Sequence, residues 1–126
     1  MRFKNIDHIV ITTQDVGACL HFYVDILGME LDQRNGRYAV RFGSQKFNIH
    51  TRKAEFLPAA EHPTYGSLDL CLILDGSLDK AKVEIERKGY PIELGPVRWH
   101  GACGAMRSIY LRDPDGNLVE LAEYHE

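Results

Sequence analysis

Four short apolar segments of the chain each carry a polar side chain of a kind that can bind a metal ion. They are His8, Asp69, Glu120 and, in the fourth segment, Asn48 or His50. An imidazole nitrogen together with carboxylate oxygens is a donor set for a divalent metal ion, and carboxylates favour harder ions than thiolates do. The residue types therefore predict a metal site, provided that the fold brings these side chains together.

The spacing of apolar residues predicts how these side chains share a face. Successive side chains of a β-strand point to opposite faces. In residues 67–74 (SLDLCLIL) the leucines recur at every second position, which leaves Asp69 and Cys71 on the other face. The same rule places five further residues opposite the apolar face of their segments: His8, Asn48, His50, Tyr110 and Glu120. Solvent exposure of one sheet face would produce the same alternation, so only the coincidence of equivalent positions favours a site.

The chain contains a repeated pattern. Residues 7–28 and 68–89 align without a gap, and each has an apolar strand, a polar turn, a helical period and a final glycine. His8 aligns with Asp69. Three strand-like pieces follow each helix, so each half is predicted to be βαβββ.

The predicted fold class is α+β. Two tandem βαβββ modules are expected to form a curved, partly open mixed β-sheet around a cleft, with the helices on the outer face. Module 1 spans about residues 4–53, a proline-containing linker spans 54–66, and module 2 spans about 67–125. Together they are predicted to form a single domain, 1–126.

Local signals place the helix ends and one loop. Thr13 or Asp15 is expected to cap the first helix, and Ser77 the second. The predicted apolar stripe of the first helix is Val16, Cys19, Leu20, Tyr23, Ile26 and Leu27. Residues 101–106 (GACGAM), preceded by Trp99 and His100, are expected to form a loop that closes over the pocket.

Composition excludes several classes of partner. The net charge of −3 gives no electrostatic footprint for nucleic acid or an anionic membrane. Three widely spaced cysteines without a CxxC pair indicate reduced thiols. The first residues, MRFKNIDHIV, lack a signal-peptide layout, so a cytoplasmic protein is expected.

Three motifs resemble one protein family over most of the chain. They are DHIVITTQDV (7–16), FYVDILGMEL (22–31) and RDPDGNLVELAEY (112–124). The chain resembles the vicinal oxygen chelate superfamily, which contains glyoxalase I, extradiol dioxygenases and bleomycin-resistance proteins. Within it, the chain is most similar to small glyoxalase-domain proteins of undefined activity.

The resemblance implies a ligand set. His8 matches the first metal ligand of the family and Glu120 the last, while Asp69 falls where the family usually has histidine. The fourth position falls on Asn48, and His50 on the same face is the other candidate for a ligand or a substrate contact. The metal would be a divalent ion, with nickel, zinc, manganese, iron and magnesium all open.

The resemblance also implies an activity. The expected function is that of a metal-dependent, glyoxalase I-like lyase or isomerase, acting on a small oxygenated substrate that chelates the metal. Glu120 would be the catalytic base, and Arg107 and Tyr110 would bind substrate. An extradiol-type dioxygenase and a non-enzymatic, bleomycin-resistance-like binding protein are the alternatives. A homodimer is expected by the same resemblance.

Overall fold

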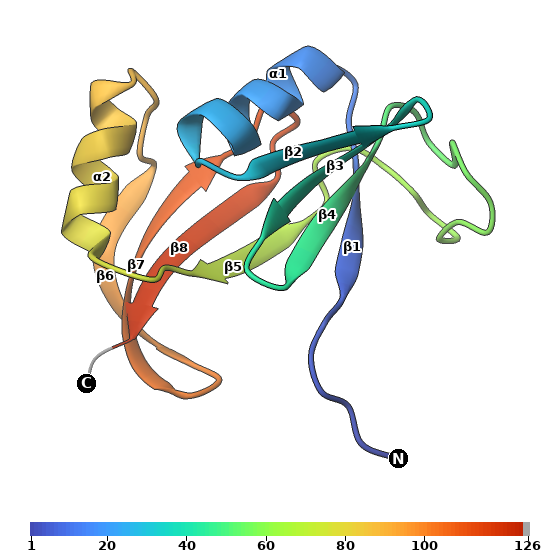
Figure 1. The fold of residues 1–126 in the computed structure, drawn as a ribbon. Helices are drawn as coiled ribbons and strands as arrows, with labels where there is room; N and C mark the ends of the chain where they lie inside the picture. Colours follow the sequence, from blue (N-terminus) through green and yellow to red (C-terminus); the bar gives the residue numbers. More distant parts are fainter. Residues whose placement is uncertain (125–126) are drawn as a thin grey trace. The chain divides into compact units, whose positions relative to one another are not determined.

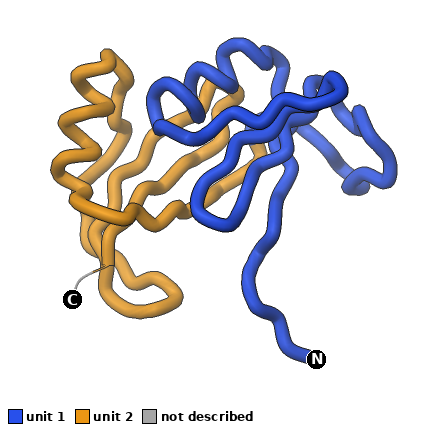
Figure 2. Tube along the Cα trace, viewed as in Figure 1, with its two compact units in different colours: residues 1–66 blue, residues 67–126 orange. Residues whose placement is uncertain are grey.

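The computed structural model describes residues 1–124, so the last residue of predicted module 2, residue 125, lies outside the described part. The chain forms two compact units, Met1–Gly66 and Ser67–Glu126 (Figure 2). Each unit contains one four-stranded mixed sheet and one helical segment, in the order βαβββ (Figure 1). The predicted α+β class and the repeated βαβββ plan are confirmed.

In unit 1 the strand order is β1-β4-β3-β2. The elements are β1 (His8–Thr12), α1 (Val16–Leu20), a π-helical continuation η1 (His21–Ile26), β2 (Glu30–Arg34), β3 (Arg37–Phe42) and β4 (Gln45–His50). β1 runs parallel to β4, and the other two pairs are antiparallel. This register pairs Val10 with Asn48 and Thr12 with His50.

In unit 2 the strand order is β5-β8-β7-β6, which repeats the plan of unit 1. The elements are β5 (Asp69–Ile73), α2 (Leu78–Arg87), β6 (Leu94–Gly101), β7 (Gly104–Arg112) and β8 (Leu118–Tyr124). β5 runs parallel to β8, while β6–β7 and β7–β8 are antiparallel. α2 packs against β7 and β8.

The first helix begins as the sequence indicates but does not stay α-helical. The Asp15 carboxylate accepts a hydrogen bond from the backbone N–H of Ala18 at 3.0 Å and caps the helix. From His21 onward the turns widen, and the N–H of Leu27 donates to the carbonyl of Phe22, five residues back. Phe22, which the predicted stripe omits, is fully buried; its spacing from Cys19 and Ile26 is that of an ordinary apolar helix face.

Aromatic rings pack between this helix and its sheet. Tyr23 is fully buried and meets Phe47 of β4 edge-on, with ring centroids 5.7 Å apart. Phe22 meets Tyr23 in the same way at 4.8 Å. Such edge-to-face pairs stabilise beyond their buried area by about 0.5–1.5 kcal/mol each. The helix-facing side of the unit 1 sheet is thus a closed core, which leaves the opposite face for other contacts.

The predicted loop over 101–106 is in fact a hairpin. β6 continues through Gly101, which pairs directly with Gly104 of β7. The backbone N–H of Cys103 donates to the Tyr124 hydroxyl at 3.1 Å and holds the turn. Gly101 is required there, because a Cβ at this position would lie 2.6 Å from the Tyr124 hydroxyl oxygen. The prediction of a loop at these residues was wrong.

No helix among residues 1–124 is long and apolar enough to cross a membrane.

Candidate functional site

Three polar side chains form a row across the unit 2 sheet. The strand register pairs Cys71 of β5 with Glu120 of β8, and Glu120 with Tyr110 of β7. Directly paired residues share a sheet face, and all three side chains interact through Glu120. The alternation rule placed these residues on one face, and their register now makes them neighbours.

Glu120 is the one carboxylate of this row. It is 9% exposed, and its Oε2 accepts a hydrogen bond from the hydroxyl of Ser108, which is fully buried, at 2.5 Å. Its other partners are the Tyr110 hydroxyl and the Cys71 thiol. No Lys, Arg or His forms an ion pair with Glu120 among residues 1–124. A buried carboxylate held only by neutral donors is one that a bound cation would stabilise.

The neighbours of Glu120 stay protonated. Burial, followed by the hydrogen bond and negative charge of Glu120, raises the pKa of Tyr110 to about 12. Burial and the same carboxylate raise the pKa of Cys71 to about 11. At neutral pH both groups are therefore hydrogen-bond donors, and Cys71 is a poor nucleophile because only the thiolate reacts.

Asp69 and Arg107 lie on opposite faces of the unit 2 sheet. Asp69 is exposed on the same face as Cys71, two residues along β5. Arg107 lies one residue out of phase with Tyr110 and Ser108, and binds Asp79 of α2 at 2.9 Å and Glu123 at 3.2 Å. The structure thus does not bring Arg107 to the face that carries Glu120.

The Arg107 contacts anchor α2 to the sheet. Glu123 also accepts a hydrogen bond from the backbone N–H of Leu78 at 3.1 Å, in the first turn of α2. The substrate-binding role of Arg107 stays a prediction, whereas its contacts here are those of a residue that holds the helix.

His8 of unit 1 is oriented by its neighbour. Its Nδ1 lies 2.7 Å from the Asp7 carboxylate. The hydrogen bond from His8 is the largest cause of the lowered pKa of Asp7, so Asp7 is ionised and the hydrogen lies on Nδ1. Within residues 1–124 the Nε2 atom forms no hydrogen bond. A carboxylate that fixes the tautomer of a histidine in this way is a common support of metal-ligating histidines.

Asn48 and His50 share the sheet face of His8 and line a pocket. The pocket is open, measures about 250 Å³, and lies over β2, β3 and β4. Loss of hydration lowers the pKa of His50; the charge of Glu55 opposes this effect and the charge of Arg37 adds to it, and the imidazole is neutral at pH 7. The pocket belongs entirely to unit 1 (blue in Figure 2).

The segment predicted as a linker forms one wall of this pocket. The Glu55 carboxylate accepts hydrogen bonds from the backbone N–H and the hydroxyl of Thr51, at 2.9 and 2.7 Å. This turn places the ring of Phe56 edge-on to His50, with centroids 5.2 Å apart. The Cζ atom of Arg37 lies 3.9 Å from the centre of the same ring.

Among residues 1–124 no three His, Cys, Asp or Glu side chains are already arranged to hold a metal ion. The expected ligands belong to different units, since His8 lies in unit 1 while Asp69 and Glu120 lie in unit 2. The donor chemistry of each unit suits a divalent ion: a free imidazole nitrogen in one, an uncompensated carboxylate in the other. The ligand set of His8, Asp69 and Glu120 therefore stays a prediction.

The DPDGN stretch is a structural turn. The Asp113 carboxylate accepts the backbone N–H groups of Asp115 and Asn117, at 3.0 and 2.9 Å, and the side-chain amide of Asn117 at 2.7 Å. Asn117 in turn accepts the backbone N–H of Leu68 at 2.9 Å. This turn sets where β8 begins beside β5, and thereby places Glu120 opposite Cys71.

Comparison with known proteins gives a family and several relatives. Residues 5–121 match the model of the Glyoxalase/Bleomycin resistance protein/Dioxygenase superfamily. The chain is 42% identical over 125 residues to virulence protein STM3117 of Salmonella typhimurium, covering 98% of this chain and 87% of that protein. It is 43% identical over 124 residues to the glyoxalase domain-containing protein RDO1 of Mycosarcoma maydis, covering 98% of this chain and 70% of that protein.

Solved structures have the same fold. The crystal structure of STM3117 matches with a TM-score of 0.95, over 99% of this chain and 100% of that one, at 42% identity. A lactoylglutathione lyase from Agrobacterium tumefaciens matches with a TM-score of 0.76, over 98% and 96% of the two chains, at 25% identity.

Proposed function

Because this chain belongs to the Glyoxalase/Bleomycin resistance protein/Dioxygenase superfamily, we propose that it is a metal-dependent lyase or isomerase of the glyoxalase type. Its substrate is a small oxygenated molecule that offers two adjacent oxygens. The likeness to a lactoylglutathione lyase at 25% identity supports this reaction class over the other activities of the superfamily.

The observation that carries the proposal is the Glu120 carboxylate, which is buried among neutral donors and forms no ion pair with Lys, Arg or His in residues 1–124. We assign Glu120 and His8, whose Nε2 forms no hydrogen bond within residues 1–124, as two ligands of a divalent ion. Asp69 is assigned as the third ligand and Asn48 or His50 as the fourth or as a substrate contact. When bound, the metal ion supplies Lewis acidity at the substrate oxygens.

The residues around Glu120 prepare it to handle a proton. Ser108 donates to Oε2 and thereby orients the carboxylate. Tyr110, protonated well above neutral pH, donates to the carboxylate and shares its sheet face. We assign Glu120 as the general base and Tyr110 as the residue that orients it and meets the substrate.

Elemental analysis of untagged protein, purified without chelator, tests the proposal. It requires about one divalent ion per chain, together with loss of that ion in Glu120→Gln. Protein that contains no metal and takes none up on titration would refute it and leave the non-enzymatic binding protein as the function.

Oxygen consumption distinguishes the dioxygenase alternative from the proposed lyase. A dioxygenase loaded with Fe(II) consumes dissolved oxygen in the presence of catechols, whereas a lyase does not. His8 is the one histidine among the three assigned ligands His8, Asp69 and Glu120, while oxygen-activating iron sites use two histidines and one carboxylate. This difference favours the lyase.

The remaining assignments complete the proposal. We place the protein in the cytoplasm as a homodimer, with a small molecule as its only other partner and neither nucleic acid nor a membrane. Sedimentation equilibrium at micromolar concentration tests the dimer, and a mass of one chain would contradict it.

A further inference from the structure

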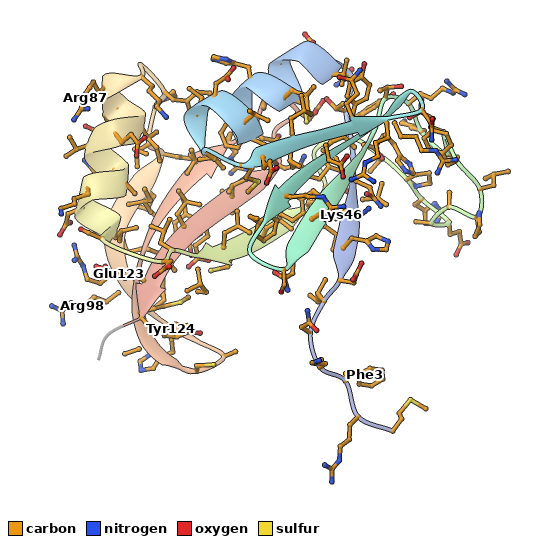
Figure 3. All side chains as sticks on the ribbon, viewed as in Figure 1. Phe3, Lys46, Arg87, Arg98, Glu123 and Tyr124 are labelled. Carbon is orange, nitrogen blue, oxygen red and sulfur yellow. The ribbon has the colours of Figure 1, made fainter. Side chains whose placement is uncertain are left out.

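The pocket of unit 1 has an unusual concentration of positive charge. Four cationic side chains and one carboxylate line it: Arg34, Arg37, Arg41, Lys46 and Asp32. The protein as a whole is acidic, with a net charge of −3, so this excess is local. Lys46 is labelled on β4 in Figure 3.

The strand register explains why these charges gather. Arg41 of β3 pairs with Lys46 of β4, and Ala39 pairs with both Asn48 of β4 and Asp32 of β2. Paired residues share a face, so the cations belong to the same sheet face as Asn48 and His50. The small side chain of Ala39 lies between them and leaves room for the hollow.

Asp32 positions two of the arginines without blocking them. Its Oδ1 accepts from Nε of Arg34 at 2.8 Å, and its Oδ2 accepts from Nε of Arg41 at 2.9 Å. Each arginine is held through Nε alone, so its terminal nitrogens remain for another acceptor. No further hydrogen bond to these terminal nitrogens occurs within residues 1–124.

The other two cations have no carboxylate partner. Neither Arg37 nor Lys46 forms an ion pair in the described part of the chain. Arg37 instead stacks on the ring of Phe56, 3.9 Å from its centre. Stacking orders the guanidinium plane while leaving its edge N–H groups free, and such a fork matches the oxygens of a carboxylate or a phosphonate.

We infer that this pocket binds the oxyanion of a small ligand, a carboxylate or a phosphonate carried on an apolar or aromatic group. Oxygens of the anion meet Arg37, Lys46 and the free ends of Arg34 and Arg41. The apolar part rests against Phe56. The volume of about 250 Å³ suits a ligand smaller than a drug-sized molecule. Taking this anion as the substrate rests on the proposed function, whereas its binding requires no metal.

Calorimetric titration of chelator-treated protein with phenylphosphonate tests the inference. Benzyl alcohol, which has the same ring and no charge, is the matched control ligand. Arg37→Gln and Lys46→Gln should each weaken phenylphosphonate binding about tenfold, the size expected for one hydrogen bond to a charged group. Benzoate should lose affinity in the same two variants, and so tests the carboxylate form of the ligand.

Arg98→Gln is the control variant. Arg98 is exposed on β6 of unit 2 and forms no ion pair in the described residues, so its loss should change the affinity less than about twofold. Because the lost contacts are electrostatic, added salt should weaken binding to the wild type more than to Arg37→Gln.

Three results would overturn the inference. The first is no binding at about 10 mM phenylphosphonate, a concentration that half fills even a weak site. The second is a loss of affinity in Arg98→Gln as large as in Arg37→Gln or Lys46→Gln. The third is an affinity for benzyl alcohol equal to that for phenylphosphonate. Metal uptake is measured separately on the same variants. A protein that binds phenylphosphonate as described but takes up no metal keeps this pocket and refutes only the proposed lyase.

Discussion

Ser108→Ala isolates the contact on which the Glu120 carboxylate depends. Ser108 is fully buried and donates its hydroxyl to Glu120 at 2.5 Å. A hydrogen bond to a charged group contributes about 1.5–3 kcal/mol, against about 0.5–1.5 kcal/mol for a neutral pair. The variant should therefore lose about 2 kcal/mol of unfolding free energy in metal-free protein at pH 7, a large share of the roughly 5–15 kcal/mol typical of a domain.

Urea denaturation followed by circular dichroism measures this loss. Ser67→Ala, at an exposed serine whose side chain forms no hydrogen bond within residues 1–124, is the matched control and should change the free energy by less than about 0.5 kcal/mol. Measuring Ser108→Ala in the Glu120→Gln background shows how much of its cost depends on the charge at position 120. There the acceptor is neutral, so Ser108→Ala should cost about 1 kcal/mol less than in the wild type.

A cost of Ser108→Ala no greater than that of Ser67→Ala would refute the reasoning. So would an equal cost with Glu120 and with Gln at position 120, because the hydrogen bond would then owe nothing to a buried charge.

Three more results follow from the same contacts. Asn117→Ala should lower the unfolding free energy by about 2–4 kcal/mol, because it leaves the carboxylate of Asp113 and the backbone N–H of Leu68 without these hydrogen bonds. Gly101→Ala should cost about 1–3 kcal/mol by forcing a Cβ against the Tyr124 hydroxyl. Ultraviolet titration should give Tyr110 a pKa of about 12; since this is above the unfolded value, stability should fall as pH rises from about 10 to 12.

Each of these results has its own control. Asn5→Ala, at an exposed side chain, should be nearly neutral, and an Asn117→Ala cost as small would contradict the structural role of the turn. Gly17→Ala, with only Asp15 near its Cβ at 3.5 Å, should not destabilise. In Glu120→Gln the pKa of Tyr110 should fall toward its ordinary value, because the hydrogen-bonded negative charge is gone. An unchanged value would exclude Glu120 as a cause.

Most of the fold was predictable from the spacing of apolar residues and from the residues that begin and end helices. Alternating leucines, capping residues and the repeat of one pattern at two places predicted βαβββ twice. The widening of the first helix was not predictable, because a π-turn keeps no period that a stripe of residues reveals. The burial of Phe22, in contrast, was predictable, because its spacing from Cys19 and Ile26 fits the ordinary helical period.

The site was predictable where the alternation of side chains along a strand determines which face a residue lies on. Alternation put Glu120 and Tyr110 on one face, and the register made them neighbours. The same rule contained a signal for Arg107 that was not used: it is two residues from buried Ile109 and so shares the helix-facing side. Arg37 and Arg41 alternate with Tyr38 and Val40 in the same way, and could have pointed to the cationic pocket.

The pocket wall at Phe56 could not have been predicted from the sequence. It depends on the Glu55 carboxylate binding Thr51 four residues earlier, in a segment whose prolines indicate only irregular structure. Contacts of this kind have no period, and a single sequence does not distinguish them from a linker.

Uptake of a divalent ion by chelator-stripped, untagged protein tests the central claim most directly. Calorimetric titration with Mn²⁺, Ni²⁺ and Zn²⁺ in turn should give, for at least one ion, about one ion per chain in the wild type. This binding should be lost in His8→Ala and in Glu120→Gln and kept in His21→Ala, whose imidazole is also exposed and paired with a neighbouring aspartate. Absence of uptake by the wild type, or uptake unchanged in His8→Ala and Glu120→Gln, would contradict the proposed metal site.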